Sequence, residues 1–355
     1  MSIEFSSPIK LGDLELKNRV VMAPLTRSRA TVDRVPTAMM AEYYSQRASA
    51  GLIISEATVI SEEANGYTQT PGLFTDAQVE GWKLTTNAVH QKGGLIVAQL
   101  WHVGRVSHPD LLNGETPVSS SSVQQAGHVS LLRPKRDYVL ARPLETSEIH
   151  AITAQFKQAA INAKAAGFDG VELHAANGYL IDQFLQTKTN LRTDEYGGSA
   201  ENRARFLLEV IDALIEVWGA GRVGIHLAPR GDEHDMGDAN PKETFGYVLE
   251  ELARRNIAFF FTREYLADDS ISQYLRKRGA GVPFIANMKL ERDDALNLLK
   301  TNQADAVAFG KNYIANPDLF ERLVQNAPLN ELRFENMIGT DVAEGYVDYP
   351  FLEPK

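Results

Sequence analysis

Three polar side chains of different chemistry, His174, Asn177 and Tyr179, fall within six positions of the sequence. An imidazole, an amide and a phenol are all hydrogen-bonding groups, and the imidazole and the phenol can also exchange protons. They follow a short apolar strand expected over 170–173, and the carboxyl end of such a strand is where α/β proteins place catalytic groups. A lone histidine would more simply cap the strand, and a tyrosine would pack in the loop. Three convergent groups favour a catalytic function.

The elements that must position this cluster alternate between apolar strands and helical patterns. Eight strands, each followed by a helix, predict a closed (β/α)8 TIM barrel that spans 1–355 as a single domain, with a β-hairpin cap over 9–16. A doubly wound open sheet is the alternative, but Pro24-Leu25-Thr26 follows the first strand in place of a GxGxxG phosphate turn. The expected strands are 19–23, 52–57, 95–100, 170–173, 223–227, 257–262, 283–286 and 306–309. The expected helices are 38–50, 75–91, 146–166, 199–218, 242–255, 271–278, 292–301 and 317–324.

Two segments fall outside this alternation, an insertion over 101–145 after the third strand and a loop-like tail over 326–355. An insertion this long in a compact domain is usually functional, and we expect it to act as a lid. Its histidines, His102 and His108, have no carboxylate at ligand spacing, so we expect no metal. The serines at 119–122 lack the G-x-S-x-G elbow of a serine hydrolase.

The composition narrows the class of partner. The chain has a formal net charge of −10 and no cysteine. An acidic protein is a poor match for nucleic acid or an anionic membrane, and the absence of cysteine excludes disulfides, Fe–S clusters and a thiol nucleophile. The N-terminus has no hydrophobic signal core and no run reaches membrane-spanning length. These features predict a soluble, cytoplasmic protein, and they leave open whether it is a monomer or a homodimer.

The residues just beyond each expected strand should share the mouth of the barrel. Neutral hydrogen-bonding groups dominate the first half of this ring and basic groups the second. This asymmetry suits a planar heterocycle over the first four strands and a phosphate near the last two. A Schiff-base lyase is a weaker alternative, because Lys311 is the one lysine at a strand end. The ring comprises Leu25-Thr26, Glu56-Ala57, Gln99 with Trp101, His174 with Asn177 and Tyr179, His226, Thr262-Arg263, Asn287-Met288 and Gly310-Lys311.

Long motifs over nearly the whole chain resemble the old yellow enzyme family, and most closely its branch with N-ethylmaleimide reductase and pentaerythritol tetranitrate reductase. The resemblance is strongest over 19–107 and 165–215. The motifs are MAPLTRSRA (Met22–Ala30), GYTQTPGLF (Gly66–Phe74), QLWHVGR (Gln99–Arg105), HAANGYLIDQFL (His174–Leu185), RTDEYGGSAENR (Arg192–Arg203), FGKNYIANPDL (Phe309–Leu319) and GYVDYP (Gly345–Pro350).

The resemblance implies non-covalent FMN, which takes hydride from NADPH or NADH and passes it to an activated alkene (an enone, maleimide or nitroalkene), and possible use of nitrate esters. By carry-over, His174 and Asn177 bind the substrate oxygen and Tyr179 donates the proton. Thr26 contacts both flavin and substrate. The other implied flavin-binding residues are Pro24, Leu25, Ala57, Gln99, His226, Asn287, Met288, Gly310 and Lys311, and the implied pocket walls are Tyr67, Trp101 and Tyr346.

Three positions depart from the family pattern, and all three concern FMN. His226 stands where the family has an arginine, Asn287-Met288 where it has a glycine near the phosphate, and Lys311 where it has a second arginine. These changes predict either weakened FMN binding or a rebuilt site, in which Arg230 or Arg263 replaces the missing guanidinium. A degenerate barrel that serves as a binding or scaffold protein is the alternative. The retained chemical groups favour the enzyme.

Overall fold

The computed structural model describes residues 3–339 and 342–353, and its centre is a closed parallel barrel. The eight barrel strands pair in the order β4-β3-β13-β12-β11-β10-β9-β6, and a β4–β6 pairing closes the ring. The short strand β5 (Thr58–Val59) adds to β6 outside the ring. The barrel strands are β3 (Val20–Met22), β4 (Leu52–Ile54), β6 (Ile96–Trp101), β9 (Gly170–Ala175), β10 (Val223–Leu227), β11 (Phe259–Arg263), β12 (Phe284–Asn287) and β13 (Ala306–Phe309).

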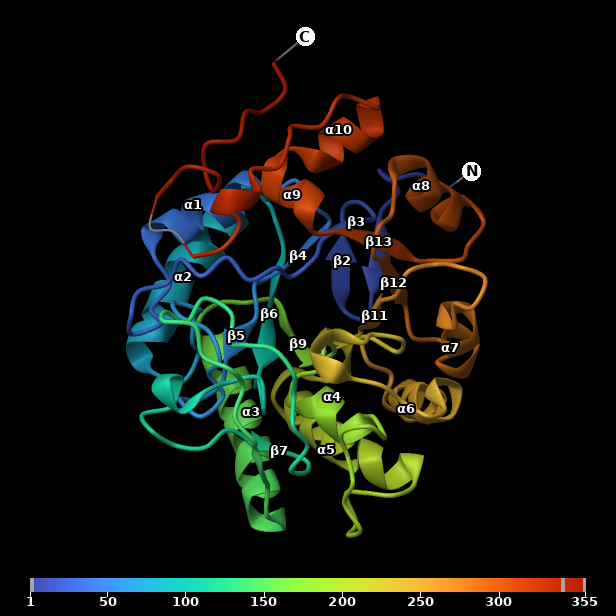
Figure 1. Ribbon diagram of the computed structural model, residues 1–355. Coiled ribbons are helices and arrows are strands. Elements are labelled where there is room, and N and C mark those ends of the chain that lie inside the picture. The colour runs from blue at the N-terminus through green and yellow to red at the C-terminus, as the bar shows by residue number, and fades with distance from the viewer. Residues whose placement is uncertain (1–2, 340–341, 354–355) are drawn as a thin grey trace.

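Helices surround this barrel, and Figure 1 looks along its axis, so that they form a ring around the strands. The two shortest α-helices, α4 and α9, lie directly after β9 and β13. The helices are α1 (Ala38–Gln46), α2 (Asp76–Gln91), α3 (Thr146–Ala165), α4 (Leu180–Leu185), α5 (Ala200–Trp218), α6 (Pro241–Arg255), α7 (Ser272–Arg278), α8 (Arg292–Lys300), α9 (Lys311–Ala315) and α10 (Leu319–Gln325). Among the described residues, every helix is too short or too polar to span a lipid bilayer.

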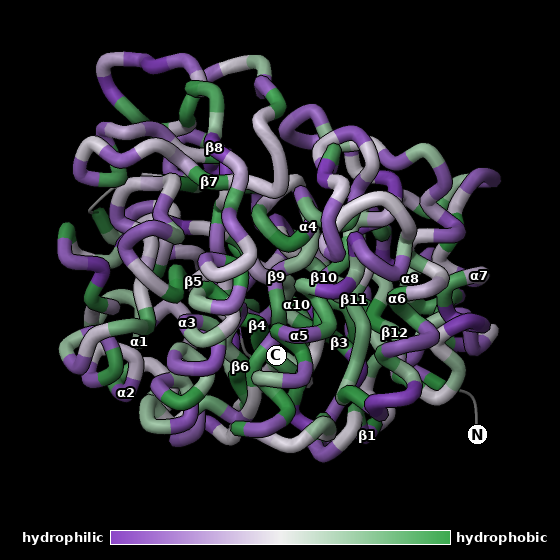
Figure 2. The backbone as a smooth tube through the Cα atoms, turned by 90° about the horizontal axis from the view of Figure 1, so that it is seen from below, coloured by the Kyte–Doolittle hydropathy of each residue, from purple (hydrophilic) through white to green (hydrophobic). Residues whose placement is uncertain are grey.

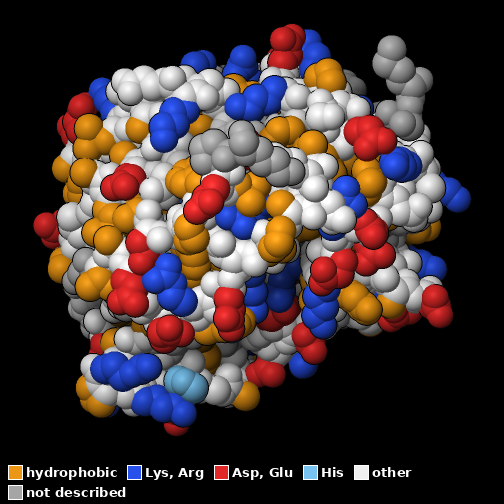
Figure 3. Space-filling view, turned by 90° about the horizontal axis from the view of Figure 1, so that it is seen from above, with side chains coloured by type: hydrophobic (Ala, Val, Ile, Leu, Met, Phe, Trp, Pro, Cys, Tyr) orange, Lys and Arg blue, Asp and Glu red, His pale blue; other side chains and the backbone are white. Residues whose placement is uncertain are grey.

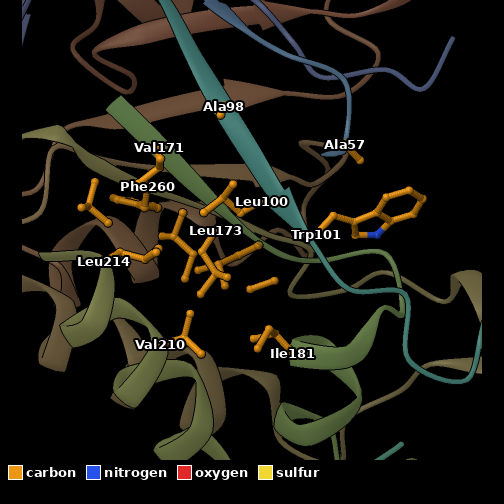
Figure 4. Packing of buried hydrophobic residues seen from close by; sticks show 14 of the residues in the cluster. Ala57, Ala98, Leu100, Trp101, Val171, Leu173, Ile181, Val210, Leu214 and Phe260 are labelled. Atoms are coloured by element: carbon orange, nitrogen blue, oxygen red, sulfur yellow. The ribbon is translucent and has the colours of Figure 1, made fainter. Parts of the chain in front are cut away.

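The barrel strands are apolar on both faces because each face packs against protein. Every residue of β9 is buried. Val171 and Leu173 point outward against Val210 and Leu214 of α5, as Figure 4 shows. A second apolar cluster, which includes Phe259 of β11, fills the barrel interior. The polar segments therefore lie at the periphery, and the apolar strands lie in the middle (Figure 2).

The expected elements appear in the expected order. The start of α2 is a capping box, in which Thr75 accepts from the Gln78 backbone and Gln78 bonds back to Thr75. The hairpin forms from β1 (Ile9–Leu11) and β2 (Leu14–Leu16). The insertion contains a 3-10 turn, η1 (Pro109–Leu111), and two short strands, β7 (Val118–Ser119) and β8 (Arg142–Pro143), which pair in parallel.

Several boundaries differ from the expectation. Helix α1 ends at Gln46, and the expected second strand stops at Ile54 and resumes as β5. Helix α9 is absent from the expected helices, because five residues are too few for a periodic pattern. Strand β9 extends to Ala175, so His174 lies within it rather than beyond the expected end at residue 173. The tail carries a 3-10 turn, η4 (Phe334–Asn336).

Candidate active site

A cavity of about 780 Å³ lies at the carboxyl end of the barrel. It brings together nearly all the residues that the sequence singles out, although they come from the ends of all eight barrel strands. The predicted residues that line it are Pro24, Leu25, Thr26, Ala57, Tyr67, Gln99, Trp101, His174, Asn177, Tyr179, His226, Arg263, Asn287, Met288, Gly310 and Lys311.

His174 enters the cavity from β9, and in the barrel register it is paired with His226 of β10. Its ring stacks over Trp101 at 6.2 Å between centroids and meets the edge of Tyr179 at 5.0 Å. Burial lowers the pKa of His174 to about 3, so the imidazole is neutral near pH 7. A neutral imidazole has one N–H donor, and His174 Nδ1 has no partner among the described residues.

Asn177 lies in the loop between β9 and α4, with a left-handed backbone (φ 59°) that asparagine tolerates better than most residues. Its carbonyl oxygen bonds to His234 Nδ1 at 2.7 Å. Its side-chain Oδ1 accepts from Arg263 Nη1 at 3.0 Å. Because a guanidinium only donates, this bond fixes which end of the amide is oxygen and leaves Nδ2 as a donor for a ligand.

Tyr179 caps the N-terminus of α4, and its hydroxyl lies 2.9 Å from that of Tyr67. The ring packs edge-on against Trp101, with 4.9 Å between centroids. Burial raises the pKa of Tyr179 above its ordinary value of 10.0, so the phenol stays protonated. The site therefore holds a proton beside two hydrogen-bond donors, His174 and Asn177.

The floor of the cavity is a buried polar layer formed by Gln99, Glu172 and His226. Gln99 Nε2 donates to Glu172 Oε2 at 2.7 Å and lies 3.4 Å from His226 Nδ1. Burial lowers the pKa of His226 and raises that of Glu172 to about 8. Because the amide nitrogen of Gln99 is turned toward Glu172, its carbonyl oxygen remains as an acceptor for a ligand N–H.

The far end of the cavity is formed by the residues after β12 and β13. Met288 has a φ of 99° and Lys289 a φ of 52°, so Met288 adopts a conformation that normally requires glycine. Asn287 Nδ2 donates to the Ala308 carbonyl at 2.7 Å. Gly310 touches Leu25, since an added Cβ would lie 2.9 Å from Leu25 Cδ1. Lys311 begins α9, and its Nζ lies 5.1 Å from the centre of the Phe334 ring.

Contrary to the expectation, Tyr346 does not line the cavity. It is fully buried and stacks on Tyr43, with 4.2 Å between ring centroids. Arg27 and Arg29 lie over its ring at 4.8 and 4.4 Å. Tyr346 therefore anchors the C-terminal segment to the barrel rather than contacting a ligand.

The two arginines considered as replacements differ in position. Arg230 does not line the cavity, because it pairs with the buried Glu264 at 2.6 Å and also with Asp269. Arg263, at the end of β11, lines the cavity beside Asn177.

Other lining residues escaped the sequence analysis. Glu233 and His234 follow the fifth strand, so the strand-end rule could have found them. Ser130 in the insertion and Met337 in the tail are brought in by long-range packing that has no local signal. His102 and His108 instead cap turns, with Nδ1 accepting from the backbone of Gly104 and Asp110.

Comparison with known proteins gives the family. The model of the NADH:flavin oxidoreductase / NADH oxidase family matches residues 4–330. The old yellow enzyme homologue from Zymomonas mobilis superimposes with a TM-score of 0.95 at 43% identity, over 98% of this chain and 100% of that chain. The chain is an old yellow enzyme. It is therefore a flavin-dependent oxidoreductase, with FMN as cofactor and a nicotinamide nucleotide as reductant.

Further relatives span the same length of this old yellow enzyme. Morphinone reductase in complex with tetrahydroNAD superimposes with a TM-score of 0.93 at 48% identity, over 99% of this chain and 98% of that chain. The 12-oxophytodienoate reductase 1 of Oryza sativa is 44% identical over 99% of this chain and 94% of its own. A probable FMN-dependent alkene reductase of Leishmania infantum is 42% identical over 97% and 96%. These matches support the family as a whole and do not single out the N-ethylmaleimide reductase branch.

The residues of the cavity fit FMN. Trp101 Nε1, His174 Nδ1 and His226 Nε2 are buried without a partner among the described residues, and buried polar atoms normally have one. The Gln99 carbonyl and the Thr26 hydroxyl can meet the acceptor and donor atoms of a flavin edge. The cavity volume also falls in the range of about 300–1,000 Å³ that small-molecule sites occupy.

Proposed function

We propose that this ene-reductase reduces alkenes conjugated to a carbonyl or nitro group, such as enones, maleimides and nitroalkenes. The observation that carries the proposal is the convergence of His174, Asn177 and Tyr179 on one cavity that also fits FMN. Bound FMN supplies the hydride for the alkene carbon. The protein must then polarise the alkene and provide a proton.

His174 and Asn177 polarise the alkene by binding the activating oxygen. The neutral imidazole and the Asn177 Nδ2 each offer one donor, and neither is occupied by a protein acceptor among the described residues. Their hydrogen bonds strengthen as negative charge develops on that oxygen. They therefore stabilise the transition state more than the bound substrate, which lowers the activation barrier. Nitrate esters present acceptor oxygens of the same kind, and we extend the proposal to them.

Tyr179 supplies the proton to the other alkene carbon. Its raised pKa keeps it protonated, and its hydrogen bond to Tyr67 orients the hydroxyl. We propose that Tyr67 and Trp101 form the wall against which the substrate lies, since both line the cavity and their rings are 5.3 Å apart.

The remaining lining residues hold FMN in this proposal. Pro24, Leu25, Thr26, Ala57 and Gln99 surround the ring system, with His226 beside it on the floor. Asn287, Met288, Gly310 and Lys311 face the phosphate. A scaffold protein without flavin would not need a cavity of this size lined by unpartnered donors, so the observations do not favour that alternative.

The experiment that tests the proposal is a visible spectrum of the purified protein before and after dialysis, followed by anaerobic NADPH or NADH. We expect a flavin band that bleaches with the reductant and returns when 2-cyclohexenone is added. A band that stays bleached with every alkene offered, yet returns with oxygen, would contradict the proposed substrate class. A colourless protein that FMN cannot reconstitute would show that the altered residues have ended flavin binding.

A further inference from the structure

Arg263 is a cation on the wall of the cavity, and orienting Asn177 uses only one of its nitrogen atoms. It ends β11, and its guanidinium lines the cavity with about a third of the side chain exposed (32%). Its Nη1 donates to Asn177 Oδ1 and also pairs with Glu233. Among the described residues, Nε and Nη2 have no partner, so three N–H groups of the fork remain free for a ligand.

Among the described residues, a single carboxylate contacts Arg263, and the titratable side chains beside it are otherwise neutral. His174 and His226 are near enough for the guanidinium to lower their pKa further, and both are neutral because they are buried. Tyr179 is protonated. Glu233 is therefore the one anion in direct contact with Arg263 within the described part of the chain. Its Oε2 is buried without a partner, so this carboxylate is not held by any second cation there.

The charge on the surface of the protein would not by itself favour an anionic substrate. The face over α9, α10 and the C-terminal segment carries interspersed acidic and basic side chains, with Lys and Arg side chains visible in a hollow near its centre (Figure 3). The whole chain has a net charge of −10, which repels anions at long range. Selectivity for an anionic substrate would therefore depend on a local contact such as Arg263.

The bond between Arg263 and Asn177 places the guanidinium next to the substrate. Since Asn177 Oδ1 is occupied by Arg263, the Nδ2 that we assign to the substrate oxygen belongs to the same small amide group. A carboxylate attached close to the activating carbonyl would thus lie within reach of Nε and Nη2. The planar fork of an arginine matches a carboxylate with two parallel hydrogen bonds, which a lysine cannot reproduce.

We propose that Arg263 forms a carboxylate-binding subsite, so that the enzyme prefers conjugated alkenes that also bear a carboxylate near the activating carbonyl. This inference rests on the proposed ene-reductase function. Arg263 also acts as a positioning residue for Asn177, and that role serves neutral and anionic substrates alike. The ratio of kcat/KM for an anionic substrate to kcat/KM for a matched neutral substrate therefore reports on the subsite alone.

The test compares N-carboxymethylmaleimide with N-ethylmaleimide as substrates of the FMN-loaded enzyme. These maleimides share one reacting alkene, and the chain has no cysteine that they could alkylate. We expect wild type to favour the acid in kcat/KM. Arg263→Gln should reduce that preference about tenfold to a hundredfold, the range for a hydrogen bond to a charged group. The preference of Arg263→Lys should lie between those of wild type and Arg263→Gln. Glu233→Gln should increase the preference.

The matched control is Arg278→Gln, which removes an arginine that pairs with Glu250 on the surface away from the cavity. It should leave the preference unchanged. An equal preference in wild type and Arg263→Gln would overturn the inference, as would an equal loss in the control. Circular dichroism and the flavin spectrum establish that each variant is folded and loaded.

A binding measurement separates this inference from the proposed function. N-carboxymethylsuccinimide and N-ethylsuccinimide have no alkene to reduce, so calorimetric titration of the loaded enzyme reports recognition alone. Tighter binding of the acid that disappears in Arg263→Gln supports the subsite even if wild type does not reduce N-ethylmaleimide. Equal binding of the two succinimides, with N-ethylmaleimide still reduced, overturns the subsite and leaves the ene-reductase standing.

Discussion

At the scale of single residues, the proposed proton donation by Tyr179 can be tested separately from substrate binding. Its ring packs against Trp101 and His174, and its hydroxyl is hydrogen-bonded to that of Tyr67. Tyr179→Phe should keep the packing and lose the proton. We expect oxidation of the reduced enzyme by 2-cyclohexenone to slow about a hundredfold or more, because positioned acids contribute about 10²–10⁴-fold. Reduction by NADPH should not change. Stopped-flow absorbance measures both steps separately.

Tyr67→Phe is the control for this prediction, since it removes the hydrogen bond to Tyr179 and keeps the proton on Tyr179. Its effect should be much smaller. Unaltered turnover of the enone by Tyr179→Phe would show that water or another group donates the proton.

At the scale of elements, local patterns predicted the barrel and many of the residues that line the cavity. Apolar runs marked eight strands because parallel strands are buried on both faces, and residues after a strand share one mouth by topology. Contacts between distant segments were beyond such patterns. The stacking of Tyr346 on Tyr43 and the approach of Met337 to the cavity depend on how the C-terminal segment packs across the barrel. The bond from Arg263 to Asn177 likewise joins the end of β11 to the loop after β9, and no sequence spacing relates the two.

The loop after β12 provides a prediction at the same scale. Met288 adopts a φ of 99°, and such a conformation costs a residue with a side chain about 1–3 kcal/mol. Met288→Gly should relieve that strain, offset by about 0.5–1 kcal/mol from the added freedom of glycine in the unfolded chain. We expect net stabilisation of about 1 kcal/mol in urea unfolding. Loss of the side chain from the cavity should also lower the dissociation constant of FMN.

Asn256→Gly is the matched control for this loop. Asn256 has a φ of 53° at the C-terminus of α6 and does not line the cavity. It should change stability slightly and leave FMN affinity unaltered. If Met288→Gly weakens FMN binding, the methionine side chain itself contacts the cofactor, and the comparison with a family glycine does not apply.

At the scale of the whole molecule, we propose that the chain folds as one domain, since strands from Val20 to Phe309 close one ring. The stability of that ring should depend on pH through the buried carboxyl of Glu172. Its pKa is raised from 4.5 to about 8 by burial, with a smaller opposing effect from Gln99. Between these values the folded chain keeps a proton that the unfolded chain releases. Stability contributed by this group therefore falls as pH rises through that window and is not regained above it.

Glu172→Gln removes this dependence, because its side-chain oxygen can still accept from Gln99 and cannot ionise. For FMN-free protein, wild type and variant should melt at similar temperatures at pH 5. At pH 9 the variant should melt about 5 °C higher than wild type. Ionising a buried carboxyl costs a few kcal/mol, and each kcal/mol shifts the Tm of a protein of this length by about 2 °C. Asp182, whose pKa is raised to about 7, acts in the same direction in both proteins and cancels in the difference.

Calorimetry at both pH values measures this difference, with Glu80→Gln as the control on the exposed surface of α2. The control should follow wild type at each pH. If Glu172→Gln also follows wild type, Glu172 is ionised in the folded barrel below pH 8. Gln99 would then donate to a permanently charged carboxylate beneath the flavin site. Because His226 stands where the family has an arginine, no cation at that position would balance this charge. The neutral floor that we infer beneath the cofactor therefore depends on the proton of Glu172.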